Sequence, residues 1–308
     1  MTDRVLCHTV TAAEDGALLR TLLRETLGIS SSLLARLKRV DGAIRLNGKS
    51  VTVRSVVRCG DAVCVSVCVE ENPHIRSIDG KLPPLSVLYE DEDILVLDKA
   101  AGVYAHRAST APEAPCLLDA IHAHGGGTYA AHLVNRLDRG TSGVLLAAKS
   151  GYVHELLRRA LLTGTLRRSY LAVVEGAPSP AEGCIDLPIT RAEGSIIKRC
   201  VSPHGDAART RYESVAVGDG CTLVRLFPET GRTHQLRVHM SAIGHPLVGD
   251  WLYGTEDRAR ITRPALHSRT LSFDHPLTHE TMVFRAPLPV DMTNLLSNLV
   301  EGWQEDDF

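Results

Sequence analysis

The sequence predicts an α+β protein with two unequal domains, and three observations support this fold class. The chain has 308 residues, a length typical of about two domains. Residues 16–67 combine two helical patterns with short strands, whereas longer apolar strands alternate with helices from residue 85 onward. The residues between them carry Pro, Gly and charges without periodicity. We therefore expect a small N-terminal α/β domain (1–72), a linker (73–84), a larger domain (85–290) and an acidic C-terminal tail (291–308).

The composition is that of an ordinary globular protein, with 44% apolar and 23% charged residues. No apolar run reaches the roughly 18 residues that a membrane-spanning helix needs. The start of the chain, "MTDRVLCHTVTAAEDG", lacks the basic-then-apolar pattern of a signal peptide. We therefore expect a cytoplasmic protein without membrane contact. The sequence does not set an oligomeric state, and a monomer is the simplest expectation.

Eight cysteines are scattered through the chain without the regular spacing of a disulfide framework, and no C-x-x-C pair occurs. In the stretch "AVCVSVCVE", alternation puts Cys64 and Cys68 on the same face of a strand. This pattern favours reduced core thiols over a zinc site.

The N-terminal domain begins with apolar residues at helical spacing. Leucines recur in this way in residues 16–27, and Gly28 is a natural stop. The serines at 30–32 then offer an N-cap for a second helix over 33–40. Residues 41–67 have the pattern of short strands separated by Asp-Gly, Asn-Gly and Gly-Asp turns.

Basic residues are concentrated in this domain, although the formal net charge of the chain is −2. From Gly16 to Asp61 there are nine Lys/Arg and only three Asp/Glu, whereas the tail "EGWQEDDF" holds four acids. A near-neutral total can therefore hide a basic surface on one domain. The alternative interpretation is a solvated, charged helix face.

The stretch "ISSSLLARLKRVDGAIRLNGKSV" followed by "VVRCGDAVCV" resembles the S-four-type RNA-binding fold, also called the alpha-L motif. The shared features are a helix, a turn, Asn-Gly-Lys and Gly-Asp. This resemblance implies that the basic side chains of the domain contact RNA phosphates, and the candidates are Arg36, Lys38, Arg39, Arg45 and Lys49.

The larger domain has the alternating pattern of an α+β unit that ends near residue 289. Strands are expected at 94–102, 143–150, 167–176 and 221–228, and helices at 151–162 and 233–244. The last residues are expected to form a short helix or a frayed acidic tail.

The familiar cofactor and metal motifs are absent from the sequence. There is no G-x-x-x-x-G-K-[ST], and "GDGCTL" at Gly218 lacks the third glycine of a dinucleotide fingerprint. "HGGGT" at His124 is not followed by a G-x-S-x-G elbow. H-E-x-x-H does not occur, and His234 and His239 are five residues apart rather than four. We therefore expect no cofactor and no metal.

Three polar segments are unusual for a plain core: residues 132–150, 167–176 and 229–254. In the first of them, "NRLDRGTSG" sets Asp138 between Arg136 and Arg139, directly before a glycine-containing turn and an apolar strand. A surface turn with a salt bridge is the ordinary interpretation of such an aspartate.

The three segments together resemble the RluA-type pseudouridine synthase family. The family motif HRLDxxTSG stands here as "NRLDRGTSG", and TGRTHQ[IL]R matches without a gap. Several long motifs in the family's order are far more specific than any one alone. The matching segments are 87–102, Asn135–Gly143, Thr230–Arg237, Gly244–Gly254 and 265–278. The resemblance implies a pseudouridine synthase catalytic fold, in which a mixed, largely antiparallel sheet is flanked by helices and loops.

The sequence departs from the family pattern in two places. Asn135 replaces the family's histidine, although asparagine can also form hydrogen bonds. Ala100 replaces the usual proline and Asp98 the common asparagine. Neither change touches Asp138.

The resemblance implies isomerisation of uridine in structured RNA to pseudouridine, with Asp138 as catalytic nucleophile or base. It assigns the ion-pair partner of this carboxylate to Arg232, and an arginine within about 4–6 Å typically lowers an aspartate pKa. Tyr170 matches the tyrosine that stacks on the flipped-out uracil, and Leu236 an apolar position of the same pocket. Arg136 and Asn135 are expected to support the site.

Two other functions are compatible with parts of the sequence. One is a non-catalytic RNA-binding or ribosome-assembly factor, which a replaced Asp138, Tyr170 or Arg232 would have favoured. The other is a metal-dependent hydrolase built on the 14 histidines. The sequence leaves open whether the RNA is large-subunit ribosomal RNA or transfer RNA.

Overall fold

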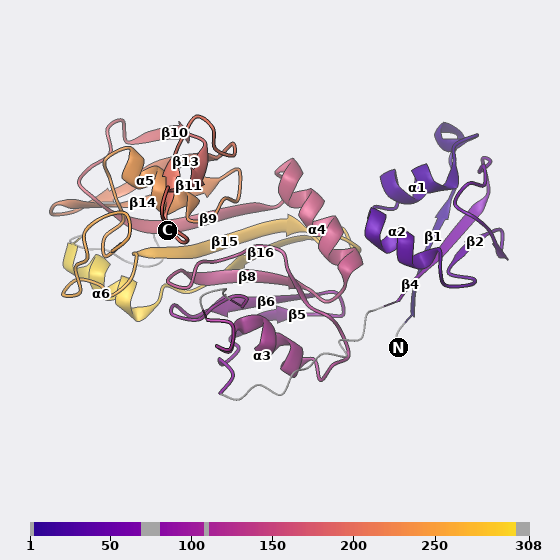
Figure 1. Ribbon diagram of the computed structural model, residues 1–308, viewed down its shortest axis with the longest axis horizontal. Helices are drawn as coiled ribbons and strands as arrows, with labels where there is room; N and C mark the ends of the chain where they lie inside the picture. The colour runs from indigo at the N-terminus through magenta and orange to yellow at the C-terminus, as the bar shows by residue number, and fades with distance from the viewer. Residues whose placement is uncertain (1–2, 69–80, 108–110, 300–308) are drawn as a thin grey trace.

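A ten-stranded sheet forms the centre of the larger domain in the computed structural model, which describes residues 3–68, 81–107 and 111–299. Figure 1 shows this sheet with helices packed against it. The strands are, in sheet order, β10 (Glu182–Asp186), β13 (Arg209–Val217), β14 (Cys221–Pro228), β9 (Arg167–Glu175), β15 (Leu266–Asp274), β8 (Ser142–Ala148), β6 (Ile94–Lys99) and β5 (Val87–Glu90), with β16 (Thr281–Arg285) on β15 and β7 (His132–Leu133) on β8.

Antiparallel pairing dominates this sheet. Among its described strand pairs, β8 and β15 alone run parallel, and β6 with β8 or β9 with β14 are typical of the antiparallel pairs. The predicted α+β fold with a mixed, largely antiparallel sheet is confirmed.

Strict alternation of side chains gives the sheet two apolar faces. In β6, Ile94 and Val96 belong to one buried cluster, whereas Leu95 and Leu97 belong to another. Every residue of β8 is buried, as expected for a strand covered on both faces. Helix α4 (Gly151–Thr163) packs on the first face, and α3 (Leu117–His124) and α5 (Gln235–Ala242) pack on the second.

The C-terminal helix α6 (Val290–Leu299) corrects the predicted start of the acidic tail at residue 291. Its Met292, Leu295 and Leu296 are buried in one cluster with Leu171 and Val173 of β9. Because these side chains complete the apolar cover of the sheet, the helix belongs to the larger domain. The tail beyond it lies outside the described residues, as do residues 73–80 of the predicted linker.

The N-terminal domain combines a four-stranded antiparallel sheet, in the order β1-β4-β2-β3, with two short helices. The Ser30 hydroxyl accepts the backbone N–H of Leu33 and caps the second helix, as its serines predict. Strand β1 was not predicted from the sequence. The elements are β1 (Asp3–Thr9), η1 (Ala12–Glu14), α1 (Leu19–Glu25), α2 (Ser31–Leu37), β2 (Ile44–Leu46), β3 (Lys49–Ser50) and β4 (Ala62–Cys68).

A disulfide between Cys7 and Cys64 contradicts the prediction of reduced thiols for Cys64. The two residues lie directly opposite each other in the β1–β4 register. The pairing depends on β1, so a sequence reading without that strand could not find it.

Helix α4 joins the two domains, and Figure 1 shows it on the side of the sheet that faces the N-terminal domain. The Tyr152 hydroxyl donates to the carbonyl oxygen of Leu27 over 3.0 Å, and Arg159 donates to that of Arg24 over 3.0 Å. A side chain at Gly28 would overlap Leu156. Among the described residues, no helix is long and apolar enough to cross a membrane.

Gly143 lies where β8 and β15 approach each other most closely. Its φ is +105°, and a Cβ atom there would overlap the backbone of Ser268. Gly164 is a matched control, because it also has a positive φ (+77°) but no heavy atom lies within 4 Å of an added Cβ.

We expect Gly164→Ala to lower the free energy of unfolding by about 1–2 kcal/mol, the cost of a left-handed backbone. Gly143→Ala should cost at least about 3 kcal/mol, because overpacking adds to this cost. Urea unfolding of both variants measures the difference. Equal losses of stability in the two variants would contradict the close approach of Gly143 to the Ser268 backbone.

Candidate active site

An open cleft of about 560 Å³ lies at the ends of the central strands. The residues that line it come from the turn before β8, from α4, from β9 and from the segment that leads from β14 into α5. All six predicted catalytic and supporting residues line this one cleft: Asn135, Arg136, Asp138, Tyr170, Arg232 and Leu236. The geometry therefore brings together residues that lie about a hundred positions apart in the sequence.

The turn that carries Asp138 is held from beneath by buried side chains. The Asn135 amide donates to the Val144 carbonyl oxygen over 3.1 Å, and its own oxygen accepts the Leu146 N–H over 2.8 Å. The Asn135 side chain thus forms the hydrogen bonds with β8 that the backbone of a neighbouring strand would otherwise form. Arg263 donates to the carbonyl oxygen of Gly140 over 3.0 Å.

Lys99, at the end of β6, supports the same turn and is almost completely buried, with 1% of its surface exposed. Its ammonium donates to the carbonyl oxygens of Ala100 and Val103, both over 2.9 Å, and of Arg139 over 3.4 Å. Burial lowers the pKa of Lys99 to about 7, and the negative charge of Asp138 acts in the opposite direction.

The arginine that faces Asp138 is Arg237, in the first turns of α5. Its Nε and one Nη hold the two oxygens of Asp250 at 2.7 Å each, and its other Nη lies 3.7 Å from Oδ2 of Asp138. Asp250 is completely buried and also accepts the backbone N–H of Leu252. The carboxylates raise the pKa of Arg237 against its burial, so the guanidinium stays charged at the wall of the cleft.

The predicted pairing of Asp138 with Arg232 is wrong. Arg232 donates to the carbonyl oxygen of Ala207 over 2.9 Å, and its nearest carboxylate is that of Asp206 at 4.0 Å. Helix α5 begins after Arg232, so Arg232 points to the rim of the cleft while Arg237 lies on the buried side of the helix. Arg232 still lines the cleft.

His234 is the second side chain that faces Asp138, and it was not predicted. Its Nε2 lies 4.0 Å from Oδ2 of Asp138. Its Nδ1 lies 2.8 Å from the Tyr253 hydroxyl, which also accepts the backbone N–H of Arg199 over 2.9 Å.

The loop before α5 is tied to the sheet by Gln235. Its side-chain oxygen accepts the Thr230 hydroxyl over 2.7 Å and the Arg232 N–H over 3.0 Å, and its amide donates to the Arg209 carbonyl oxygen over 2.9 Å. These bonds hold the loop and fix the entry into the helix.

Tyr170 and Leu236 form an apolar wall of the cleft and are 5% and 7% exposed. They belong to one buried cluster. Basic side chains lie around this wall, and Arg136 is exposed on the cleft. Arg139 donates to the Gly102 carbonyl oxygen over 3.0 Å and lies over the ring of Tyr104.

The five predicted RNA-contacting residues of the N-terminal domain do not line the cleft. All of them are exposed on that domain: Arg36, Lys38, Arg39, Arg45 and Lys49. Such exposed basic side chains can contact a polyanion at a distance from the cleft.

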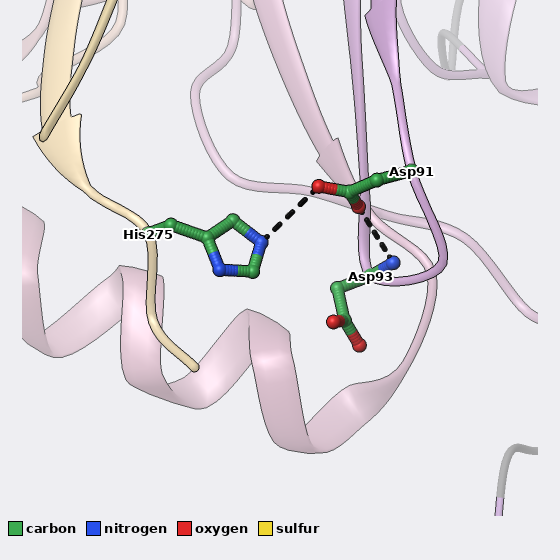
Figure 2. Close-up of side chains that lie close together, drawn as sticks. All are labelled: Asp91, Asp93 and His275. Atoms are coloured by element: carbon green, nitrogen blue, oxygen red, sulfur yellow. Dashed lines mark hydrogen bonds and ion pairs between the residues drawn. The ribbon is translucent and has the colours of Figure 1, made fainter. Parts of the chain in front are cut away.

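In the described part of the chain, Asp91, Asp93 and His275 form the one group whose ligand atoms lie close enough to hold a metal ion. Figure 2 shows the His275 imidazole turned toward the Asp91 carboxylate, with Nε2 3.3 Å from Oδ2. Nδ1 of His275 accepts the backbone N–H groups of Leu277 and Thr278, at 3.4 and 3.1 Å. The ring proton therefore lies on Nε2, which has no lone pair for a metal. This geometry fits a contact between two turns rather than a metal site.

Comparisons with known proteins identify the class of this site. A family model described as RNA pseudouridylate synthase matches residues 93–242. The chain is 44% identical over 272 residues to the uncharacterized RNA pseudouridine synthase YjbO of Bacillus subtilis, covering 88% of this chain and 95% of that protein. It is 34% identical over 321 residues to ribosomal large subunit pseudouridine synthase D of Vibrio parahaemolyticus, covering 98% and 96%.

A solved structure has the same fold. The human RNA pseudouridylate synthase domain containing 1 protein superposes with a TM-score of 0.58 at 27% identity, over 72% of this chain and 90% of that one. The chain therefore belongs to the RNA pseudouridine synthase family and is an isomerase that acts on RNA. This finding favours the enzyme over the non-catalytic RNA-binding factor and over the metal-dependent hydrolase.

Arg237 and His234 both face Asp138, and neither was predicted as a site residue. Both nevertheless lie inside a motif quoted from the sequence. The signal that could have found Arg237 is the Gly-Asp pair at 249–250. A buried aspartate requires a buried cation, and Arg237 is the arginine on the inner face of α5. His234 carries no comparable signal, because its role depends on the distant Tyr253.

We expect Arg237→Lys to lower kcat/KM for pseudouridine formation by about 100-fold or more, because a lysine cannot grip Asp250 with two bonds and also face Asp138. Arg232→Lys should lose less than about tenfold. Initial rates on the RNA that the wild-type protein modifies measure both. A larger loss in Arg232→Lys would restore Arg232 as the partner.

Lys99 should make stability depend on pH. Its pKa is about 7 in the folded protein against 10.5 as the ordinary value, so between these two values the unfolded chain binds more protons. The free energy of unfolding therefore rises with pH in this range. Measured by urea unfolding between about pH 7 and pH 9, wild type should gain stability relative to Lys99→Met. If the stability difference between wild type and Lys99→Met stayed constant or fell with pH, the lowered pKa of Lys99 would be contradicted.

Proposed function

We propose that the chain isomerises uridine in large-subunit ribosomal RNA, with Asp138 as the catalytic carboxylate. The observation that carries this proposal is the ion pair of Asp138 with the buried Arg237, at 3.7 Å in the cleft. The assignment of the RNA is supported by the Vibrio relative, a ribosomal large subunit pseudouridine synthase that matches over nearly the whole chain. Transfer RNA is the other substrate that the sequence leaves open.

The reaction balances within one nucleotide. The glycosidic bond from the ribose C1′ to N1 of the base breaks, the base turns, and a bond from C1′ to C5 forms. The proton on C5 is lost and N1 gains one, so no oxidant, reductant or second substrate is needed. In this scheme Asp138 acts as nucleophile or as base, and Arg237 holds its carboxylate in place.

Tyr170 and Leu236 provide the apolar side of the cleft. We assign the face of the uracil to the ring of Tyr170, because stacking on an aromatic side chain returns about 1–3 kcal/mol of the cost of unstacking a base. Leu236 packs beside it. Arg136 and Arg232, at the rim, face the phosphates on either side of the flipped nucleotide, and Asn135 keeps the turn in position.

The N-terminal domain holds the RNA in this proposal. Its exposed basic residues, including Lys38 and Arg39, supply the phosphate contacts that the nearly neutral chain needs. The domain follows the S-four-type pattern over residues 1–72, and α4 contacts it through Tyr152. A ribosomal substrate supports a cytoplasmic site of action, and a monomer is the simplest state in this proposal.

The test is site-level mapping of pseudouridine in total RNA from cells with the gene, without it, and with Asp138→Asn. We expect one or a few uridines in large-subunit ribosomal RNA to be modified only when Asp138 is present. The purified variant should keep its RNA affinity within about threefold, since the substitution is isosteric. A modified site in transfer RNA would correct the substrate, and unchanged modification in Asp138→Asn would remove Asp138 from the chemistry.

A further inference from the structure

His234 has a left-handed backbone conformation, which is uncommon for a residue other than glycine. Its φ and ψ are 58° and 17°, in the left-handed region, at the position before α5. Glycine adopts this region most readily, and asparagine, aspartate and histidine are enriched in it among the other residues. At this position the conformation sets the direction of a side chain that lies between Tyr253 and Asp138.

The contacts of Tyr253 favour the tautomer of His234 in which Nε2 carries the proton. The backbone N–H of Arg199 can only donate, so the Tyr253 oxygen accepts it over 2.9 Å. The proton of the Tyr253 hydroxyl is then available to Nδ1 of His234, 2.8 Å away. Because Nδ1 accepts a hydrogen bond, the neutral ring carries its proton on Nε2.

This proton faces Asp138. Nε2 lies 4.0 Å from Oδ2, the same oxygen that Arg237 approaches to 3.7 Å. Among the described residues, none forms an ion pair or a hydrogen bond with the other oxygen, Oδ1, of this carboxylate. The two oxygens of Asp138 are therefore in different surroundings.

The surroundings of His234 lower the pKa of its ring and favour the neutral form. Burial is the largest influence and lowers its pKa, and the cations Arg237 and Arg199 act in the same direction. The carboxylates of Asp138 and Asp250 act against them. A neutral ring with its proton on Nε2 can donate a hydrogen bond to the Asp138 carboxylate and still keep that proton.

We propose that His234 is a positioning residue: through Tyr253 its Nε2–H is fixed toward Asp138, and together with Arg237 it holds Oδ2 so that Oδ1 is the oxygen presented to the nucleotide. This inference rests on the proposed catalytic role of Asp138. Nε2 lies 4.0 Å from Oδ2, and catalytic hydrogen bonds commonly shorten when the substrate is bound.

His234→Asn is the most informative substitution, because asparagine tolerates the left-handed backbone but is too short to reach both partners. We expect kcat to fall about 10- to 100-fold, as for the loss of a hydrogen bond to a charged group, while KM stays within about twofold. If the histidine served only the backbone at the start of α5, His234→Asn would keep wild-type kcat, and that result would overturn the proposal.

Tyr253→Phe tests whether the Tyr253 hydroxyl fixes the His234 ring. The substitution removes the hydroxyl but keeps the aromatic ring, over which the Arg237 guanidinium lies at 4.9 Å. It should lower kcat in the wild-type background and have no further effect in His234→Asn. If the kcat losses of the two single variants multiplied in the double variant, or if Tyr253→Phe left kcat unchanged, Tyr253 would not act through His234. Tyr212→Phe is the matched control, because it also removes one buried hydroxyl bond, to the Pro180 carbonyl oxygen, away from the cleft.

All variants are compared as full-length protein on one RNA substrate, with thermal unfolding to verify the fold. Wild-type protein that forms no pseudouridine in any RNA would refute the proposed function itself. Active wild-type protein, inactive Asp138→Asn and fully active His234→Asn would refute the inference on His234 alone.

Discussion

The buried pair of Arg237 and Asp250 is the interaction on which the active site depends. Two charges removed from water are costly unless their hydrogen bonds are satisfied, and here two bonds of 2.7 Å join the partners while Asp250 also accepts the Leu252 N–H. The pair leaves one nitrogen of Arg237 for Asp138. A guanidinium fixed in this way presents charge to the cleft without reorganisation, which is the condition for electrostatic catalysis.

The turn that carries Asp138 needs its own support, because a fixed arginine is useful only if the carboxylate is also fixed. The Asn135 side chain hydrogen-bonds the turn to β8. Beneath the turn, the buried ammonium of Lys99 donates to backbone carbonyl oxygens. Helix α4 then connects this region to the N-terminal domain, since Tyr152 reaches that domain and Arg158 lines the cleft. One helix thus lies between the surface proposed to bind RNA and the site of chemistry.

Much of the fold could be predicted from the sequence where a local pattern is strong. The strand at 221–228 and the helix at 151–162 were expected almost at their observed bounds, because apolar periodicity fixes them. Strand β1 was missed, and with it the Cys7–Cys64 bridge, since a disulfide depends on register between distant strands. The sequence motifs predicted that Asp138, Tyr170 and Leu236 belong to one site, and all three line the cleft. They could not choose between Arg232 and Arg237, because the choice depends on where α5 begins and on the burial of Asp250.

The most direct measurement is a crystal structure of full-length Asp138→Asn bound to an RNA stem-loop that contains the modified uridine. The account predicts that this uridine leaves the RNA stack, with its uracil against Tyr170, its C1′ beside residue 138 and Arg237 still held by Asp250. A target uridine that remains stacked in the RNA, or that binds away from this cleft, would contradict it.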